Sequence, residues 1–141
     1  MDLSLAGKIA IVTGSTRGLG LAIATELVQE GCHVTICARG ETGIAEAVQH
    51  LWTLPGGAEQ VLAVQADVST DKGVADVILR TVETFGGLDI LVNNVGLARG
   101  GDIVNTTDAE WQEAFDQTLF PAVRASRMAV PQMRRRGAAR S

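Results

Sequence analysis

Residues 9–20 read Ile-Ala-Ile-Val-Thr-Gly-Ser-Thr-Arg-Gly-Leu-Gly, a short apolar run that stops at a glycine-rich turn. β-Branched residues dominate the run, as is typical of a buried strand. An amphipathic stretch follows over residues 19–30 and ends at Gly31, a residue type that commonly terminates helices. This segment therefore predicts a strand, a tight turn and a helix, which together form the first unit of an α/β fold.

The same alternation continues along the chain. Further strands are expected at 34–38, 61–66 and 88–93, helices at 42–52 and 72–85, turns at 54–58 and 86–87, and a last helix from near Asp108 to about Met133. Nearly continuous hydrophobic strands are typical of a parallel sheet that is covered by helices on both faces. We expect residues 1–141 to form one doubly wound α/β domain with four strands.

The composition fits a soluble globular domain. Of the 141 residues, 46% are hydrophobic and 20% are charged, which excludes disorder and collagen. Six of the 12 Lys and Arg residues lie after residue 123, where no acid occurs, so residues 1–123 carry a net charge of −10. An acidic body argues against general nucleic-acid binding. The arginine-rich end is interpreted as a solvated helix terminus, where cations favour the negative end of the helix dipole.

Cys32 and Cys37 are the two cysteines of the chain, with His33 between them and no second cluster to complete a metal site. We interpret them as ordinary thiols of a reducing compartment. The start of the chain lacks a basic segment, and the apolar run at 9–12 is too short for a signal sequence or a membrane span. The sequence thus predicts a cytoplasmic protein that binds neither metal nor membrane.

The turn after the first strand is the place to look for a ligand, because doubly wound sheets bind ligands beyond the carboxyl ends of their strands. Gly14 permits a tight turn, Gly18 allows a pyrophosphate to approach the backbone, and Gly20 lets the helix pack close to the strand. A purely structural turn is the alternative. No lysine follows Gly18 or Gly20, so the turn is not the phosphate loop of nucleotide triphosphatases.

Three segments in register resemble the N-terminal half of the short-chain dehydrogenase/reductase family, over about residues 5–137. Residues 13–20 match its T-G-x-x-x-G-x-G motif, which includes Ser15, Thr16, Arg17 and Leu19. Asp67-Val68 is similar to its adenine-contacting pair, and residues 91–96 are similar to its N-N-A-G segment. The resemblance implies an NAD(P)-binding Rossmann fold that transfers hydride to or from a carbonyl or alcohol carbon, with a dinucleotide and a small molecule as partners.

Polar residues that follow the third and fourth strands have roles under this resemblance. Asp67 would accept a hydrogen bond from the adenine amino group, with capping of the next helix as the alternative. Asn93 and Asn94 would bridge strands and hold a ribose. Gly96 would let the cofactor approach the backbone, whereas Val95 stands where the family usually has alanine.

Cofactor choice depends on the end of the second strand. Sites selective for NAD usually have an acid there, but residues 36–40 contain none and include Arg39. Arg39 is suited to pairing a 2′-phosphate, and Arg17 would supply a second positive charge. The alternative for both is a solvated surface arginine. We predict NADP(H) as the preferred cofactor, with NAD(H) possible.

No catalytic residue can be named. The resemblance implies acid–base catalysis by a tyrosine that is paired with a lysine, but the chain has no tyrosine, and its only lysines are Lys8 and Lys72. Thr118 stands where the family has an assisting asparagine. Truncation before the catalytic half is the simplest explanation, with residues 137–141 as an ending outside the family pattern. A catalytically silent dinucleotide-binding module is the alternative.

Self-association is expected. With the strand order 3-2-1-4, the fourth strand has no partner on its outer side, and unpaired apolar edges invite pairing with other chains. The last helix is also expected to expose apolar surface at Leu119, Val123 and around Met133. We therefore predict a homo-oligomer.

Overall fold

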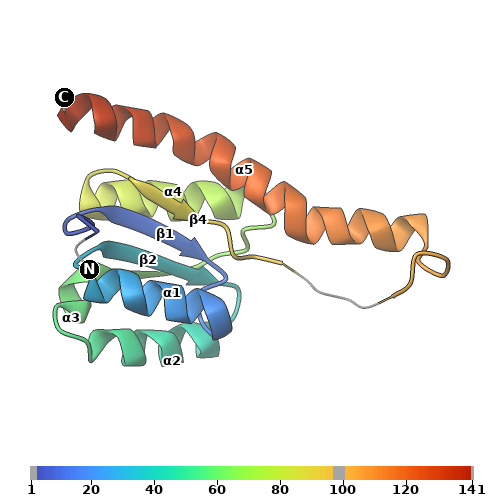
Figure 1. The fold of residues 1–141 in the computed structure, drawn as a ribbon, viewed down its shortest axis with the longest axis horizontal. Coiled ribbons are helices and arrows are strands. Elements are labelled where there is room, and N and C mark those ends of the chain that lie inside the picture. The colour runs from blue at the N-terminus through green and yellow to red at the C-terminus, as the bar shows by residue number, and fades with distance from the viewer. Residues whose placement is uncertain (1–2, 97–100, 141) are drawn as a thin grey trace.

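The structure is a computed structural model that describes residues 3–96 and 101–140, with only the backbone described for 138–140. Strands and helices alternate along the chain (Figure 1). They are β1 (Ile9–Thr13), α1 (Gly18–Gln29), β2 (His33–Ala38), α2 (Glu41–Trp52), α3 (Gly57–Gln60), β3 (Val61–Gln65), α4 (Asp71–Phe85), β4 (Ile90–Val92) and α5 (Asp108–Arg140). Helix α3 stands where a turn was expected, because Gln60 donates its N–H to the carbonyl of Gly56 (3.0 Å) and closes one helical turn.

The four strands form one parallel sheet in the order β3-β2-β1-β4. Ile11 of β1 pairs with Thr35 of β2 on one side and with Leu91 of β4 on the other. Every residue of β1 is buried, since the strand has neighbours on both sides and helices over both faces. The residues of β4 are only half-buried, and in the described part of the chain β4 pairs with β1 alone. The expected α/β fold and strand order are confirmed.

Two apolar layers hold the helices to the sheet, because successive side chains of a strand point to opposite faces. Ile11 joins the layer beneath α4 and α5, together with Val77 of α4. Val12 joins the layer beneath α1 and α2, together with Val28 of α1. Figure 1 shows this arrangement, with α1 and α2 on one side of the sheet and α4 and α5 on the other. Because the four strands are parallel, their carboxyl ends meet at one edge of the sheet.

Strand β4 is shorter than the expected 88–93. At its start, Asp89 donates its backbone N–H to the carbonyl of Ile9 (2.8 Å), while the carboxylate of Asp89 accepts from the N–H of Ile9 (2.9 Å). A side chain thus replaces the backbone acceptor that would have extended the ladder. At the other end, the side-chain amide of Asn93 donates to Ser126 Oγ of α5 (3.3 Å).

Helix α5 continues past the expected end near Met133. Ala125, Ala129 and Met133 recur every fourth residue on one face, and Met133 packs against the layer beneath α4 and α5. Met133 itself is half-buried by this packing, whereas Val130, three residues earlier on α5, is 38% exposed, so the expected apolar surface lies beside Met133 and not at it. Leu119 and Val123 lie on other faces of α5 and are 49% and 38% exposed, as expected. Self-association itself stays a prediction.

Arg136 fastens the C-terminal part of α5 to the sheet. Its Nε lies 3.3 Å from Oδ2 of Asp89, and its Nη2 donates to the carbonyl of Gly7 (3.4 Å). Its side chain is only 23% exposed. The interpretation of the arginine-rich end as entirely solvated was therefore wrong at Arg136, because the carboxylate of Asp89 binds both this guanidinium and the backbone of β1.

A buried hydroxyl pair links the sheet to α4 and gives a testable asymmetry. Thr81 donates to the carbonyl of Val77 (2.7 Å), so its oxygen accepts from the hydroxyl of Thr35, 2.8 Å away. We expect Thr81→Val to cost about 1–3 kcal/mol in the free energy of unfolding, since it strands the buried Thr35 donor. Thr35→Val should cost less, and the double variant less than the sum of the two. Urea unfolding of the three variants measures this, and equal costs for the two single variants would contradict the assigned donor direction.

Candidate functional site

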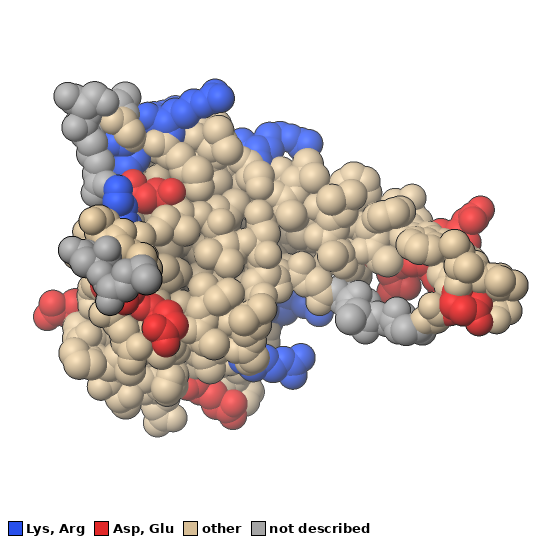
Figure 2. Space-filling model, in the orientation of Figure 1, with Lys and Arg blue, Asp and Glu red and all other residues tan. Residues whose placement is uncertain are grey.

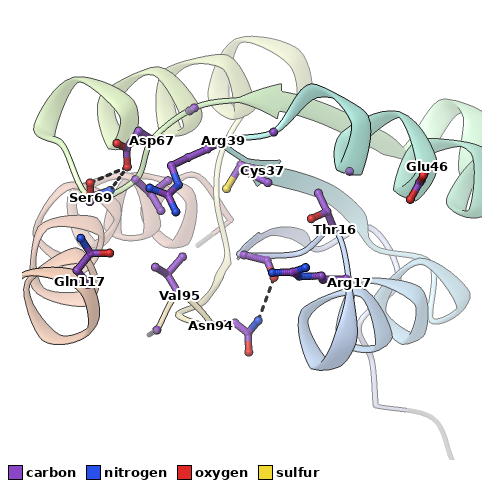
Figure 3. A pocket seen from close by; sticks show the side chains of 17 residues that line it. Thr16, Arg17, Cys37, Arg39, Glu46, Asp67, Ser69, Asn94, Val95 and Gln117 are labelled. Atoms are coloured by element: carbon purple, nitrogen blue, oxygen red, sulfur yellow. Dashed lines mark hydrogen bonds between the residues drawn. The ribbon is translucent and has the colours of Figure 1, made fainter. Parts of the chain in front are cut away.

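A cleft of about 570 Å3 lies at the edge where the strands end (Figure 3). This volume is typical of a small-molecule or cofactor site. The cleft lies beside β1, which has β2 and β3 on one side and β4 on the other. This point, where the strand order reverses, is the usual ligand position in such sheets. Its lining consists of Gly14, Thr16, Arg17, Cys37, Ala38, Arg39, Gly40, Gly43, Glu46, Ala66, Asp67, Val68, Ser69, Asn94, Val95, Gly96 and Gln117.

The glycine turn has the geometry expected from the sequence. Gly14 and Gly18 have φ angles of +59° and +58°, in the left-handed region that favours glycine. A Cβ on Gly20 would lie 2.3 Å from the carbonyl oxygen of Gly14, so only glycine allows α1 to approach β1 this closely. The first turn of α1 contains no acid, and no side chain caps its N-terminus. The positive end of the helix dipole is thus available to an anion.

Asn94 ties the end of β4 to the glycine turn. Its side-chain Nδ2 donates to the carbonyl of Gly14 (3.1 Å), and its backbone N–H donates to Thr13 Oγ1 (2.9 Å). The expected strand-bridging role of Asn94 is therefore present in the structure. The turn and the segment after β4 form one connected wall of the cleft.

Some of the residues singled out from the sequence lie outside the cleft lining. Ser15 is fully buried and points inward, where its Oγ accepts from the N–H of Cys37 (3.0 Å). Gly18 and Gly20 belong to the backbone at the start of α1, Leu19 is 70% exposed, and Asn93 is bound to Ser126. Ser15 thus holds the turn against the end of β2 rather than facing the cavity.

Asp67 lines the cleft and closes a local turn, but its side chain does not cap α4, which was the alternative role expected for it. Its Oδ1 accepts from the hydroxyl of Ser69 (2.6 Å) and from the N–H of Ser69 (3.0 Å), which closes a local turn. Those two bonds, and to a lesser degree the nearby charge of Arg39, hold the pKa of Asp67 below its ordinary value. The capping of α4 comes instead from Thr70, whose Oγ1 accepts from the N–H of Gly73 (3.0 Å). Asp67 also lines the cleft, as does Val68.

Two arginines bring positive charge to the cleft from different elements. Arg39 follows β2, and its backbone carbonyl accepts from Gln65 Nε2 (2.9 Å), which fixes the strand end. Arg17 precedes α1 in the glycine turn. Figure 3 shows both guanidinium groups in the cleft, Arg39 beside Asp67 and Arg17 beside Asn94, with Glu46 of α2 farther along the wall.

Part of the lining was not identified from the sequence. Glu46 and Gln117 come from helices α2 and α5, and the position of a helix over a strand end is not written in any local motif. Gly43 lies against Thr16, since a Cβ on Gly43 would be 3.3 Å from Thr16 Oγ1. Ser69 could have been predicted from the sequence, because it follows Asp67 by two residues, the spacing at which an aspartate side chain closes a turn.

Neither cysteine has the character of a nucleophile. Both are free and buried. Burial raises the pKa of the Cys37 thiol to about 12, and burial together with Glu30 and Asp89 raises the pKa of Cys32. Cys37 thus contributes a neutral wall to the cleft.

The sign of the surface charge changes from one end of α5 to the other. Figure 2 shows acidic side chains around the start of this helix and basic side chains along its other end. Among the residues that the structure describes, no group of three or more His, Cys, Asp or Glu residues could hold a metal ion. Within the same residues, no helix combines the length and the apolar character that crossing a membrane requires.

Comparison with known proteins gives consistent results. Residues 8–140 match the family model described as short chain dehydrogenase, so the match extends beyond residue 137, where the resemblance was expected to end. The chain is 37% identical over 134 residues to the uncharacterized oxidoreductase YvrD of Bacillus subtilis, covering 94% of this chain and 49% of that protein. It is 35% identical over 133 residues to the NADP-dependent (R)-specific alcohol dehydrogenase of Lentilactobacillus kefiri, with 94% and 51% coverage.

A solved structure agrees with these relatives. The L-sorbose reductase of Gluconobacter frateurii, complexed with NADPH and L-sorbose, superposes with a TM-score of 0.88 at 40% identity and covers 97% of this chain and 51% of its own. The chain spans about half the length of the curated relatives it matches. A match that runs through nearly all of this sequence, on the strand order and glycine turn described above, means that the chain belongs to the short-chain dehydrogenase family.

Proposed function

We propose that the cleft binds NADP(H) and that the chain serves an oxidoreductase that transfers hydride between this cofactor and a carbonyl or alcohol carbon. The observation that carries the proposal is the open glycine turn, which lies at the start of α1 and at the wall of a cleft that also receives Arg17 and Arg39. A dinucleotide needs an anion site, a place for two nucleosides and, for the phosphorylated form, a cation near the adenosine ribose.

The turn fits a pyrophosphate. A Cβ on Gly18 would meet nothing within 4 Å, so the backbone is open on that side. The uncapped N-terminus of α1 would supply N–H donors to the phosphate oxygens. Because the Gly14 carbonyl is held by Asn94 and Gly20 lies closely against that carbonyl, the donors would be arranged before a ligand binds.

The remaining cleft residues fit the two nucleoside halves. Asp67 and Val68 would contact the adenine, with Asp67 kept ionised by the bonds from Ser69. Asn94 and Gly96 line the other half, where the nicotinamide would supply or accept the hydride when bound. Val95 narrows this half, since its side chain points into the cleft in Figure 3.

The 2′-phosphate of NADP(H) would pair with Arg39, assisted by Arg17. Arg39 is exposed and occupies the position directly after β2, where selectivity for NAD usually rests on an acid. A guanidinium pairs with phosphate through two parallel N–H bonds, which gives both affinity and orientation. The NADP dependence of the Lentilactobacillus relative and the NADPH in the sorbose reductase complex support this choice.

Fluorescence titration tests the proposal directly. NADPH added to the purified chain should bind saturably, one molecule per chain, and 2′,5′-ADP should displace it. A chain with folded secondary structure by circular dichroism that shows no saturable NADPH binding would overturn the proposed function.

The family's catalysis uses a tyrosine as proton donor, and the 141 residues contain no tyrosine. We therefore expect the chain with NADPH and a panel of ketones and 3-oxoacyl thioesters to show no turnover above background, as a dinucleotide-binding module without catalysis would. The assay follows the absorbance of NADPH at 340 nm. A substrate-dependent decrease at an ordinary enzymatic rate, which Thr118→Ala abolishes, would contradict this expectation.

A further inference from the structure

Arg124 of α5 reaches across to the loop that follows β3. Its Nη1 donates to the backbone carbonyl of Ser69 (2.9 Å), and its Nε lies 3.5 Å from Oδ1 of Asp71. The guanidinium also lies 5.8 Å from the ring centre of Phe120, one turn earlier on the same helix. With 30% of its side chain exposed, Arg124 is partly withdrawn from water. These contacts hold the guanidinium in one orientation.

Ser69 connects this guanidinium to the cleft. While its carbonyl accepts from Arg124, its hydroxyl and its N–H both donate to the carboxylate of Asp67. Every polar group of Ser69 is therefore used, with α5 on one side and a cleft-lining carboxylate on the other. A rotation of the Ser69 backbone would loosen both sets of bonds.

The rest of the loop leaves little room for independent adjustment. A Cβ on Gly73 would lie 1.9 Å from the carbonyl oxygen of Asp67, so the loop packs directly on the start of α4. Ala66 donates its N–H to the carbonyl of Ala38 (3.0 Å), which anchors the start of the loop to β2. The backbone of Asp67 is thus held from both sides, and the direction of its side chain is what Ser69 determines.

We propose that Arg124 is a positioning residue for the cleft: it orients the Asp67 carboxylate toward the adenine through Ser69. This inference rests on the proposed function of the cleft. It concerns a residue that lines no part of the cavity and that no sequence motif of the chain singles out. The lowered pKa of Asp67, caused first by the Ser69 hydroxyl and then by the Ser69 N–H, is consistent with an ordered loop.

An ordinary surface ion pair does not explain the arrangement. The side chain of Asp71 is 75% exposed, and exposed ion pairs contribute about 0–1 kcal/mol. The bond to the partly buried Ser69 carbonyl is the stronger contact, because a charged donor shortens and strengthens a hydrogen bond. The function of Arg124 is therefore expected to depend on Ser69 and not on Asp71.

The experiment compares four variants of the chain. Arg124→Met removes the donor and keeps the aliphatic packing, Arg124→Lys keeps one donor, and Asp71→Asn removes the ion pair alone. Arg127→Met is the matched control, since Arg127 is an exposed arginine three residues along the same helix. Affinities for NADPH and NADH are measured by titration. The Asp67 carboxyl is titrated by 13C NMR without cofactor, with Asp67→Asn to assign its signal.

We expect Arg124→Met to weaken NADPH and NADH alike, about fivefold, and to raise the pKa of Asp67 toward its ordinary value. Arg124→Lys should restore most of the affinity, while Asp71→Asn and Arg127→Met should change it less than twofold. A selective loss of NADPH would overturn the inference, because it would mean that Arg124 contacts the 2′-phosphate itself. An unchanged Asp67 titration, or an equal loss in Arg127→Met, would overturn it as well. If the wild-type chain binds no dinucleotide, the proposed function fails, and the carboxyl titration still decides whether Arg124 acts on Asp67.

Discussion

Replacing Gly20 by alanine should destabilise the protein by about 2–4 kcal/mol, a large part of the stability of a domain this size. The added Cβ would lie 2.3 Å from the carbonyl oxygen of Gly14 and 2.5 Å from Nδ2 of Asn94. Neither neighbour can give way cheaply, because one is backbone and the other is bound to that backbone at 3.1 Å. The helix would have to move off the sheet or lose the bridge from Asn94.

Urea unfolding, followed by circular dichroism, measures the change. Gly137→Ala is the control, since a Cβ on Gly137 meets nothing within 4 Å and the residue lies within a helix, where alanine is favoured by up to about 1 kcal/mol. We expect this control to be neutral or slightly stabilising. Equal unfolding midpoints for Gly20→Ala and the wild type would mean that α1 does not approach β1 as closely as the structure has it.

Arg39→Ala should abolish the preference for NADPH over NADH. One arginine paired with a phosphate contributes roughly 1.5–3 kcal/mol, which corresponds to about a ten- to a hundredfold change in affinity for NADPH. The affinity for NADH should change less than about twofold, because NADH has no phosphate at that position. Folding should be unaffected, since the Arg39 side chain is exposed and only its backbone carbonyl is held, by Gln65.

Parallel titrations of both cofactors into the wild type and Arg39→Ala measure the selectivity. Arg39→Lys provides the control for charge alone and should fall between them, since an ammonium cannot form the paired bonds of a guanidinium. Arg17→Ala should have a smaller effect on NADPH. Equal affinities for NADPH and NADH in the wild type would remove Arg39 from the site.

The first strand, the glycine turn and the strand order could be predicted from the sequence because local rules determine them. Four apolar residues in a row, followed by a threonine, identify β1, and glycines at 14, 18 and 20 carry the conformations and close contacts that the turn requires. Parallel strands joined by helices then restrict the topology to few choices. Asp67 and Asn94 could be predicted as site residues because they come after strand ends, where the cleft is found.

The features that escaped prediction depend on contacts between distant segments. Strand β4 begins later than expected because the Asp89 side chain binds the backbone of Ile9, a residue 80 positions away in the chain. Met133 is half-buried because its face of α5 packs against the apolar layer beneath α4 and α5. Gln117 and Arg124 reach the cleft and its loop only through the placement of α5, which no periodicity reports.

The most direct test of the account is to map the amide chemical shifts of the 15N-labelled chain as NADPH is added. If the cleft is the dinucleotide site, the largest changes will fall on the glycine turn, the end of β2 and the loop after β3, including Gly14, Arg39 and Asp67, and will saturate together. Residues on the opposite edge of the sheet, such as Leu54 and Gly86, should not change. Changes confined to the exposed face of α5 around Val123 and Arg127, or no saturable change in a folded chain, would contradict the central claim.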